Sequence, residues 1–152
     1  MLNSIQVPNL DHDAMMSKEF NHKITPNGAM ERRIVAALIA HMAERGFLII
    51  GVWDGEEWEK ADTAKEAMEF IFNLDDCSLR FVKAEGFDRE AHEKTRDFDS
   101  RNAYAANEHG VYLVLGNNLD IISDWNYFND DSDGFNAAMD SFIDKYLEWS
   151  RE

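Results

Sequence analysis

The alternation of hydrophobic and polar positions is clearest in the C-terminal third of the chain. Residues 111–115 are β-branched, aromatic or leucine, and Gly116 and two asparagines follow them. Glycine and asparagine tolerate the positive φ that tight hairpin turns require. From there the next run alternates, with one face made of Ile121, Ser123, Trp125 and Tyr127. A period of two is typical of a half-buried strand, so the pattern predicts a β-hairpin over residues 111–127.

A helical pattern follows this hairpin. Apolar residues recur at steps of three and four: Phe135, Ala138, Met139, Phe142, Ile143, Tyr146, Leu147 and Trp149. Such a stripe faces a core, and Asp133 is a suitable N-cap for the helix. The opposite face carries Asp140, Asp144 and Glu148, whose spacing of four residues puts them about 6 Å apart along the axis. This row is either a solvated face or a surface that binds positive charge.

A buried helix and an interior strand are predicted upstream. The helix over residues 30–45 is apolar on more than one face and ends at Gly46. His41 lies within its apolar set, which favours a core or rim position over a role in proton transfer. Residues 47–53 have almost no polar interruption, which indicates a strand in the interior of a sheet.

An acidic edge strand and a capped helix come next. Asp54 and Gly55 form a tight-turn dipeptide, after which the chain would return along the sheet edge with Trp58 and three glutamates, Glu56, Glu57 and Glu59. Thr63 and the glutamate three residues later match a capping box for a helix over residues 64–73. Its exposed side carries a second acidic row: Asp62, Glu66 and Glu69.

The order of these elements defines the expected fold class. Residues 78–84 predict a further strand, in which Leu79 and Phe81 alternate against Arg80. Most strand connections are short, which favours antiparallel neighbours. We therefore expect one α+β domain over residues 29–152, with a mixed, mostly antiparallel sheet of four to five strands and helices packed mainly on one face.

Two segments fit this domain less simply. Residues 1–28 are polar and are expected to form a partly ordered arm with a short helix near residues 13–20. Residues 85–110 are rich in both charges, and a bare loop of that length is unusual. We expect one short helix over residues 88–96 and a second over residues 100–107. This insertion either carries a partner contact or is an excursion without a role.

The net charge of the chain is the feature that says most about its binding partners. The chain has a formal net charge of −15, and residues 1–46 are neutral while residues 47–102 carry −7 and residues 103–152 carry −8. A surface of this kind repels nucleic acid and attracts basic proteins, with fast and salt-sensitive association. Direct binding of DNA or RNA is therefore not expected.

The remaining sequence features limit the environment and the chemistry. Cys77 is the single cysteine, which excludes an internal disulfide and fits a reducing cytoplasm. No apolar run reaches the roughly 18 residues of a membrane span, and no signal-peptide pattern opens the chain. Glycine-rich nucleotide motifs and paired zinc ligands do not occur, and His92 and His109 have no recognisable nucleophile. We expect a cytoplasmic protein that is not an enzyme and needs no cofactor.

One partial metal motif stands out. Asn129, Asp131, Asp133, Gly134 and Asp140 fall at positions 1, 3, 5, 6 and 12 of a calcium loop. Against it, the preceding element reads as a strand, and the last position is Asp where a bidentate Glu is usual. A capped turn before the helix is the expected structure, with no metal.

These observations favour a non-enzymatic acidic inhibitor or decoy that binds the basic, nucleic-acid-binding surface of another protein by mimicking phosphates. In composition the chain resembles the small acidic proteins that phages and plasmids carry against bacterial defences, which implies an anti-CRISPR or anti-restriction setting. The expected contact residues are Glu56, Glu57, Glu59, Asp62, Glu66, Glu69, Asp140, Asp144 and Glu148.

Three alternatives stay open. An immunity protein that neutralises a basic toxin would use the same chemistry on a different partner. A small-ligand or carbohydrate-binding module would use exposed tryptophans, of which Trp53, Trp58 and Trp125 are the candidates. An enzyme with a noncontiguous site would need a cleft that holds a buried histidine–carboxylate pair.

Overall fold

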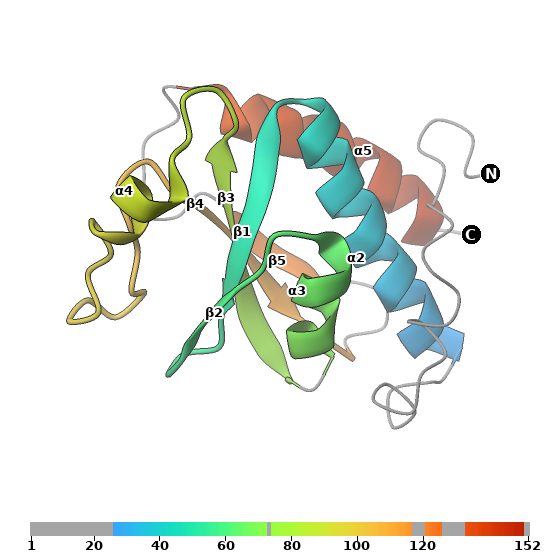
Figure 1. The fold of residues 1–152 in the computed structure, drawn as a ribbon. Helices are drawn as coiled ribbons and strands as arrows, with labels where there is room; N and C mark the ends of the chain where they lie inside the picture. The colour runs from blue at the N-terminus through green and yellow to red at the C-terminus, as the bar shows by residue number, and fades with distance from the viewer. Residues whose placement is uncertain (1–25, 73, 117–120, 126–132, 151–152) are drawn as a thin grey trace.

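The computed structural model contains a five-stranded antiparallel sheet with strand order β2-β1-β3-β4-β5 (Figure 1). It describes residues 26–72, 74–116, 121–125 and 133–150, and only the backbone of residues 26–29 and 146–150. The strands are β1 (Phe47–Trp53), β2 (Trp58–Lys60), β3 (Asp76–Lys83), β4 (His109–Val114) and β5 (Ile122–Trp125). Every neighbouring pair is antiparallel, so the expected mostly antiparallel sheet is confirmed.

The three longest helices of the described residues, called the long helices below, pack against one face of this sheet. They are α2 (Pro26–Glu44), α3 (Ala64–Ile71) and α5 (Phe135–Ser150), and α2 contacts both of the others as well as β1. Alternate residues of β3 point into the core that they enclose: Cys77, Leu79 and Phe81. The short helix α4 (Arg89–Glu93) lies away from these three helices (Figure 1). The single α+β domain predicted from the sequence is therefore the observed architecture.

The β1–β2 hairpin forms one edge of the sheet. Asp54 and Gly55 make the predicted turn, with Gly55 at φ +103°. The register of β1 against β3 shifts between Ile49 and Gly51, which marks a β-bulge. A Cβ on Gly51 would lie 2.4 Å from the indole ring of Trp58, so only glycine allows the ring to lie on this strand.

The β4–β5 hairpin corrects the expected alternation. The sequence pattern put Ile121 and Ser123 on one face and Ile122 on the other. In the structure Ile121 and Ile122 are both buried while Ser123 is exposed. The register shifts because Tyr112 pairs with Asp124 and Leu113 pairs with Ile122, so the bulge leaves Ser123 without a cross-strand partner.

Residues 85–110 contain less helix than expected. Helix α4 is present with Asp88 as its N-cap, but residues 100–107 form turns, so the second predicted helix is wrong. Ala103 and Asn107 have φ of +46° and +60°, which no helix contains. Helix α2 begins at Pro26, before the predicted start at residue 30, so the last residues of the expected arm belong to this helix. Residues 1–25 of the arm, with the helix expected near residues 13–20, lie outside the described residues. The described residues include no helix long and apolar enough to cross a membrane.

Candidate functional site

A buried ion network ties residues 85–110 to the face of the sheet opposite the long helices. Arg80 on β3 is 0% exposed, and its Nη1 donates to Glu108 Oε2 at 2.9 Å. Arg96 binds the same carboxylate with both Nη atoms, at 2.9 Å and 2.7 Å. His92 Nε2 lies 3.1 Å from Glu108 Oε1. One buried carboxylate is thus shared by two buried arginines and contacted by a histidine, and we call these four side chains the buried ion network.

The network sets the protonation state of its members. Burial alone would raise the pKa of Glu108, but hydrogen bonds from His92 and Arg96 and the charges of the two arginines lower it from 4.5 to about 2. Burial would likewise lower the pKa of Arg96, but Glu93 and Glu108 raise it above its ordinary value. The carboxylate and the guanidinium are therefore both charged at neutral pH.

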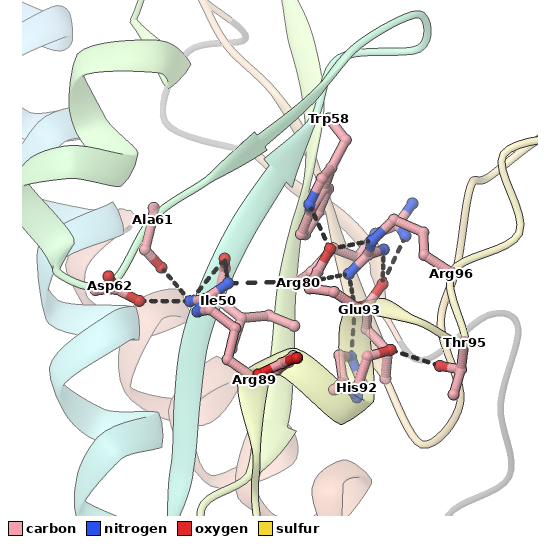
Figure 2. Close-up of polar contacts among 12 residues, drawn as sticks. Ile50, Trp58, Ala61, Asp62, Arg80, Arg89, His92, Glu93, Thr95 and Arg96 are labelled. Atoms are coloured by element: carbon pink, nitrogen blue, oxygen red, sulfur yellow. Dashed lines mark hydrogen bonds and ion pairs between the residues drawn. The ribbon is translucent and has the colours of Figure 1, made fainter.

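A second layer closes the network from the side of β2 (Figure 2). Glu93 accepts two hydrogen bonds from Arg96, at 3.0 Å and 2.8 Å, and one from the indole nitrogen of Trp58 at 3.1 Å. The Arg96 guanidinium lies 3.6 Å from the centroid of the Trp58 ring, which adds a cation–π contact. The indole N–H and the ring of Trp58 are therefore both used in contacts within the protein.

This network also fixes the loop formed by residues 97–104. Arg80 Nη2 donates to the carbonyl of Asn102 at 2.7 Å, and Arg96 Nη1 donates to the carbonyl of Ala103 at 2.8 Å. The amide of Asp97 donates to the carbonyl of Tyr104 at 3.0 Å, which closes the loop at its base. We call residues 97–104 the anchored loop.

A cavity of about 560 Å³ lies between the anchored loop and one end of the sheet. We call it the sheet-end cavity; its lining residues come from β1, the β1–β2 turn, β3, β4, β5 and the anchored loop: Trp53, Asp54, Gly55, Asp76, Cys77, Ser78, Arg101, Asn102, Tyr112 and Asp124. Three of these residues are aspartates and one is an arginine. The cavity is therefore acidic, with aromatic rings in its wall.

Each of the three carboxylates is positioned by the protein. Asp54 Oδ1 accepts hydrogen bonds from the amides of Glu56 and Glu57 at 2.8 Å and 2.7 Å, and Asp124 Oδ1 accepts one from the amide that follows it at 2.8 Å. The hydroxyl of Tyr112 donates to Asp76 Oδ2. Since one oxygen of each carboxylate is held in this way, the other can bind a cationic group without further ordering of the side chain.

The three candidate tryptophans do not lie together at one ligand site. Trp53 lines the sheet-end cavity, while Trp58 is held by Glu93 and Arg96 in the buried ion network. Trp125 packs against the hydrophobic core on the side of the long helices. A ligand in the sheet-end cavity would therefore meet Trp53 and Tyr112, and neither of the other two tryptophans.

The acidic row expected on α3 is partly used inside the protein. Asp62 forms an ion pair with Arg89, with an N–O distance of 2.5 Å (Figure 2). Glu66 Oε1 accepts a hydrogen bond from the amide of Asp62 at 2.9 Å, and Thr63 accepts one from the amide of Glu66, as the capping box predicts. Glu69 is exposed.

The other predicted acidic residues are spread over separate surfaces. Glu56 and Glu57 are exposed in the β1–β2 turn beside the sheet-end cavity, and Glu59 is half-buried on β2. Asp140 and Asp144 are exposed on α5, and the side chain of Glu148 lies outside the described part. Because α2 contacts both α3 and α5 and lies between them, the two helical rows do not form one surface (Figure 1).

The histidines serve mainly structural contacts. His41 is buried, with Nε2 2.8 Å from the hydroxyl of Ser141, a contact that joins α2 to α5. Burial lowers the pKa of His41, and the charge of Arg45 lowers it further. His109 stacks on Phe135 and lies 2.7 Å from Asp133.

A second cavity, of about 430 Å³, includes His92, which contacts the buried Glu108. This is the histidine–carboxylate pair that an enzyme would need. The hydroxyl among its lining residues belongs to Thr95, which donates to the carbonyl of His92 at 2.7 Å and accepts from the amide of Ala106. Because its proton is donated to a backbone carbonyl, the Thr95 hydroxyl is not activated by the His92 ring as a nucleophile.

The calcium loop remains a partial motif. Asp133 Oδ1 accepts a hydrogen bond from the amide of Phe135, and its Oδ2 contacts His109. It therefore acts as a cap for α5. Asn129 and Asp131 lie outside the described residues, and within the described ranges no three His, Cys, Asp or Glu side chains are placed to hold a metal ion.

Comparisons with known proteins identify no family: no family model, no curated protein and no solved structure matches this chain.

The sequence analysis did not predict Asp76, Asp124 and Tyr112 as site residues, because they are separated in the chain and only the strand register brings them together. The available signal was their position, since Asp76 begins β3 and Asp124 lies near the end of β5.

Proposed function

We propose that this protein is a non-enzymatic inhibitor or decoy that binds the basic, nucleic-acid-binding surface of another protein in the cytoplasm. The observation that carries the proposal is the sheet-end cavity, which is lined by three positioned carboxylates, two aromatic residues and one arginine. Carboxylates held in this way can replace phosphate oxygens as acceptors for lysine and arginine side chains.

The distribution of arginines supports this proposal. Arg32, Arg80 and Arg96 are buried, whereas Glu31 and Glu108 are the buried carboxylates among the described residues. Burial therefore removes slightly more positive than negative charge from the surface. The exposed side chains of the described residues are therefore at least as acidic as those residues are in total, and such a field accelerates association with a basic partner.

The aromatic wall of the cavity suits arginine in particular. A guanidinium is planar and stacks on an aromatic face while it donates hydrogen bonds to carboxylates at its edge. Trp53 and Tyr112 could provide the faces, and Asp54, Asp76 and Asp124 the acceptors. The proposal covers anti-CRISPR and anti-restriction settings, and an immunity protein against a basic toxin differs from them only in its partner.

The test begins with a pull-down of the full chain from its host, with the partner identified by mass spectrometry and purified. The variant Asp54→Asn/Asp76→Asn/Asp124→Asn removes three charges but keeps an oxygen acceptor at each position. We expect it to weaken binding by at least tenfold and to flatten the dependence of Kd on salt concentration. Calorimetry or surface plasmon resonance at several salt concentrations gives both quantities.

A matched control is Glu44→Gln/Glu85→Gln/Glu90→Gln, which changes the net charge equally at exposed positions outside the sheet-end cavity. We expect this variant to bind within about threefold of the unmodified chain, as long-range charge effects are screened. Equal affinities for the two triple variants would contradict the assignment of the site. That the acidic rows of α3 and α5 contact the partner stays a prediction. The variants Glu66→Gln/Glu69→Gln and Asp140→Asn/Asp144→Asn measure how much each row contributes to the binding affinity.

A further inference from the structure

The anchored loop presents aromatic side chains to solvent. Phe98 is 63% exposed and Tyr104 is 38% exposed. The third exposed large hydrophobic residue in the described part is Leu48 on β1, at 40%. Phe98 is thus the most exposed large apolar side chain described, and the core gains nothing from its ring.

The backbone that carries Phe98 is held from several sides. The carbonyl of Asp97 accepts from the amide and the hydroxyl of Ser100, at 3.3 Å and 3.0 Å, and the carboxylate of Asp97 accepts from the amide of Asp99 at 2.9 Å. Below it, Arg80 and Arg96 hold the carbonyls at positions 102 and 103. The loop is therefore ordered before any partner arrives, which lowers the entropic cost of using it as a contact.

Holding the loop in this form has a large internal cost. Two arginines and one glutamate are taken out of water for a loop that adds little to the hydrophobic core. Burial of ion pairs is weak as a source of stability, and its best-attested use is to specify one geometry. The geometry specified here is the one that holds Phe98 outward.

The charges around Phe98 indicate the chemistry of its partner. Asp97 and Asp99 flank the ring in sequence, both are exposed, and neither forms an ion pair with a described basic residue. Arg101 and Asn102 of the same loop line the sheet-end cavity, so the loop and the cavity form one continuous surface. A partner surface that complements Phe98 and its two neighbouring aspartates has an apolar pocket with basic side chains around it.

We propose that Phe98 is the apolar anchor of the interface, inserting into a pocket on the basic protein partner that is bordered by lysine or arginine side chains. This inference rests on the proposed function and adds an anchor to its interface. The carboxylates steer the partner and fix its register, whereas a buried aromatic anchor contributes binding energy that slows dissociation.

The first test compares Phe98→Ala with Leu48→Ala, each of which removes an exposed apolar side chain from the full chain. Thermal melting should be unchanged by Phe98→Ala, because the ring is exposed. We expect Phe98→Ala to weaken binding of the purified partner by at least about tenfold through faster dissociation, without changing the salt dependence. Leu48→Ala should bind as the unmodified chain does.

The outcomes separate this inference from the proposed function. If Phe98→Ala binds like Leu48→Ala while the triple asparagine variant binds weakly, the anchor is wrong and the acidic site stands. If Phe98→Ala weakens binding and the triple asparagine variant does not, the loop is a contact and the charge-based function is wrong. If neither variant weakens binding, both proposals fall.

A second test locates the contact directly. A photo-crosslinking p-benzoylphenylalanine replaces Phe98 in one chain and Leu48 in another, and each is irradiated with the purified partner. The expected adduct forms through position 98 alone, and mass spectrometry places it in an apolar segment next to lysine or arginine residues. Equal adducts at both positions, none at position 98, or an adduct with a second copy of this chain would overturn the proposal.

Discussion

Glu108 is the residue that joins the buried arginines on one face of the sheet. It is 0% exposed and is the shared acceptor of Arg80 and Arg96. Sequence alternation put Arg80 on the opposite side of β3 from Leu79 and Phe81, which is correct, but gave no reason to bury it. The sequence pattern did not show that Glu108, which is 28 positions away along the chain, would pair with Arg80.

Replacing this carboxylate should strongly destabilise the fold. Glu108→Gln removes the carboxylate that two buried guanidinium groups share, and losing one partner of a buried ion pair costs about 3–5 kcal/mol. We expect the free energy of unfolding in urea to fall by an amount in this range. Glu90→Gln, at an exposed position in α4, serves as the control and should change it by less than about 0.5 kcal/mol.

The same carboxylate should make stability depend on pH. Its folded pKa of about 2 lies below the ordinary 4.5, so the folded state favours the ionised form. The resulting stabilisation is fully present above pH 4.5 and is lost as the pH falls toward 2. Urea unfolding of Glu108→Gln between these pH values should show a shallower loss of stability than the unmodified chain. Parallel curves would show that Glu108 is not the group responsible.

At the scale of elements, local signals predicted most of the architecture. The turn after β1 and the cap of α3 depend on neighbours within four residues, and both were predicted correctly from the sequence. The β-bulge at Ser123 and the turns over residues 100–107 were not. Both depend on contacts with another strand or with the buried ion network, which no local pattern encodes.

The cap of α3 gives a prediction at this scale. Thr63→Ala removes the acceptor for the amide of Glu66, and such changes typically cost about 1 kcal/mol. Glu66→Gln keeps the side-chain oxygen that accepts from the amide of Asp62, so it should cost much less. Thermal unfolding of the two variants provides the comparison. A larger loss for Glu66→Gln would mean that the charge of Glu66, rather than its hydrogen bond, stabilises the helix.

At the scale of the whole molecule, net charge could be predicted from the sequence but its placement could not. The two acidic rows predicted from the sequence belong to α3 and α5, which have α2 between them (Figure 1). The sheet-end cavity instead combines residues from four strands, the β1–β2 turn and the anchored loop, because the register of the sheet aligns Tyr112 with both Ser78 and Asp124. A surface assembled in this way has no contiguous sequence signature.

The most direct test of the central claim is a competition titration of the purified partner with its own nucleic acid. Increasing amounts of this protein should displace a fluorescently labelled oligonucleotide in proportion to binding, and the variant Asp54→Asn/Asp76→Asn/Asp124→Asn should displace it only at concentrations at least tenfold higher. A ternary complex, in which protein and oligonucleotide bind the partner together without loss of affinity, would contradict the account.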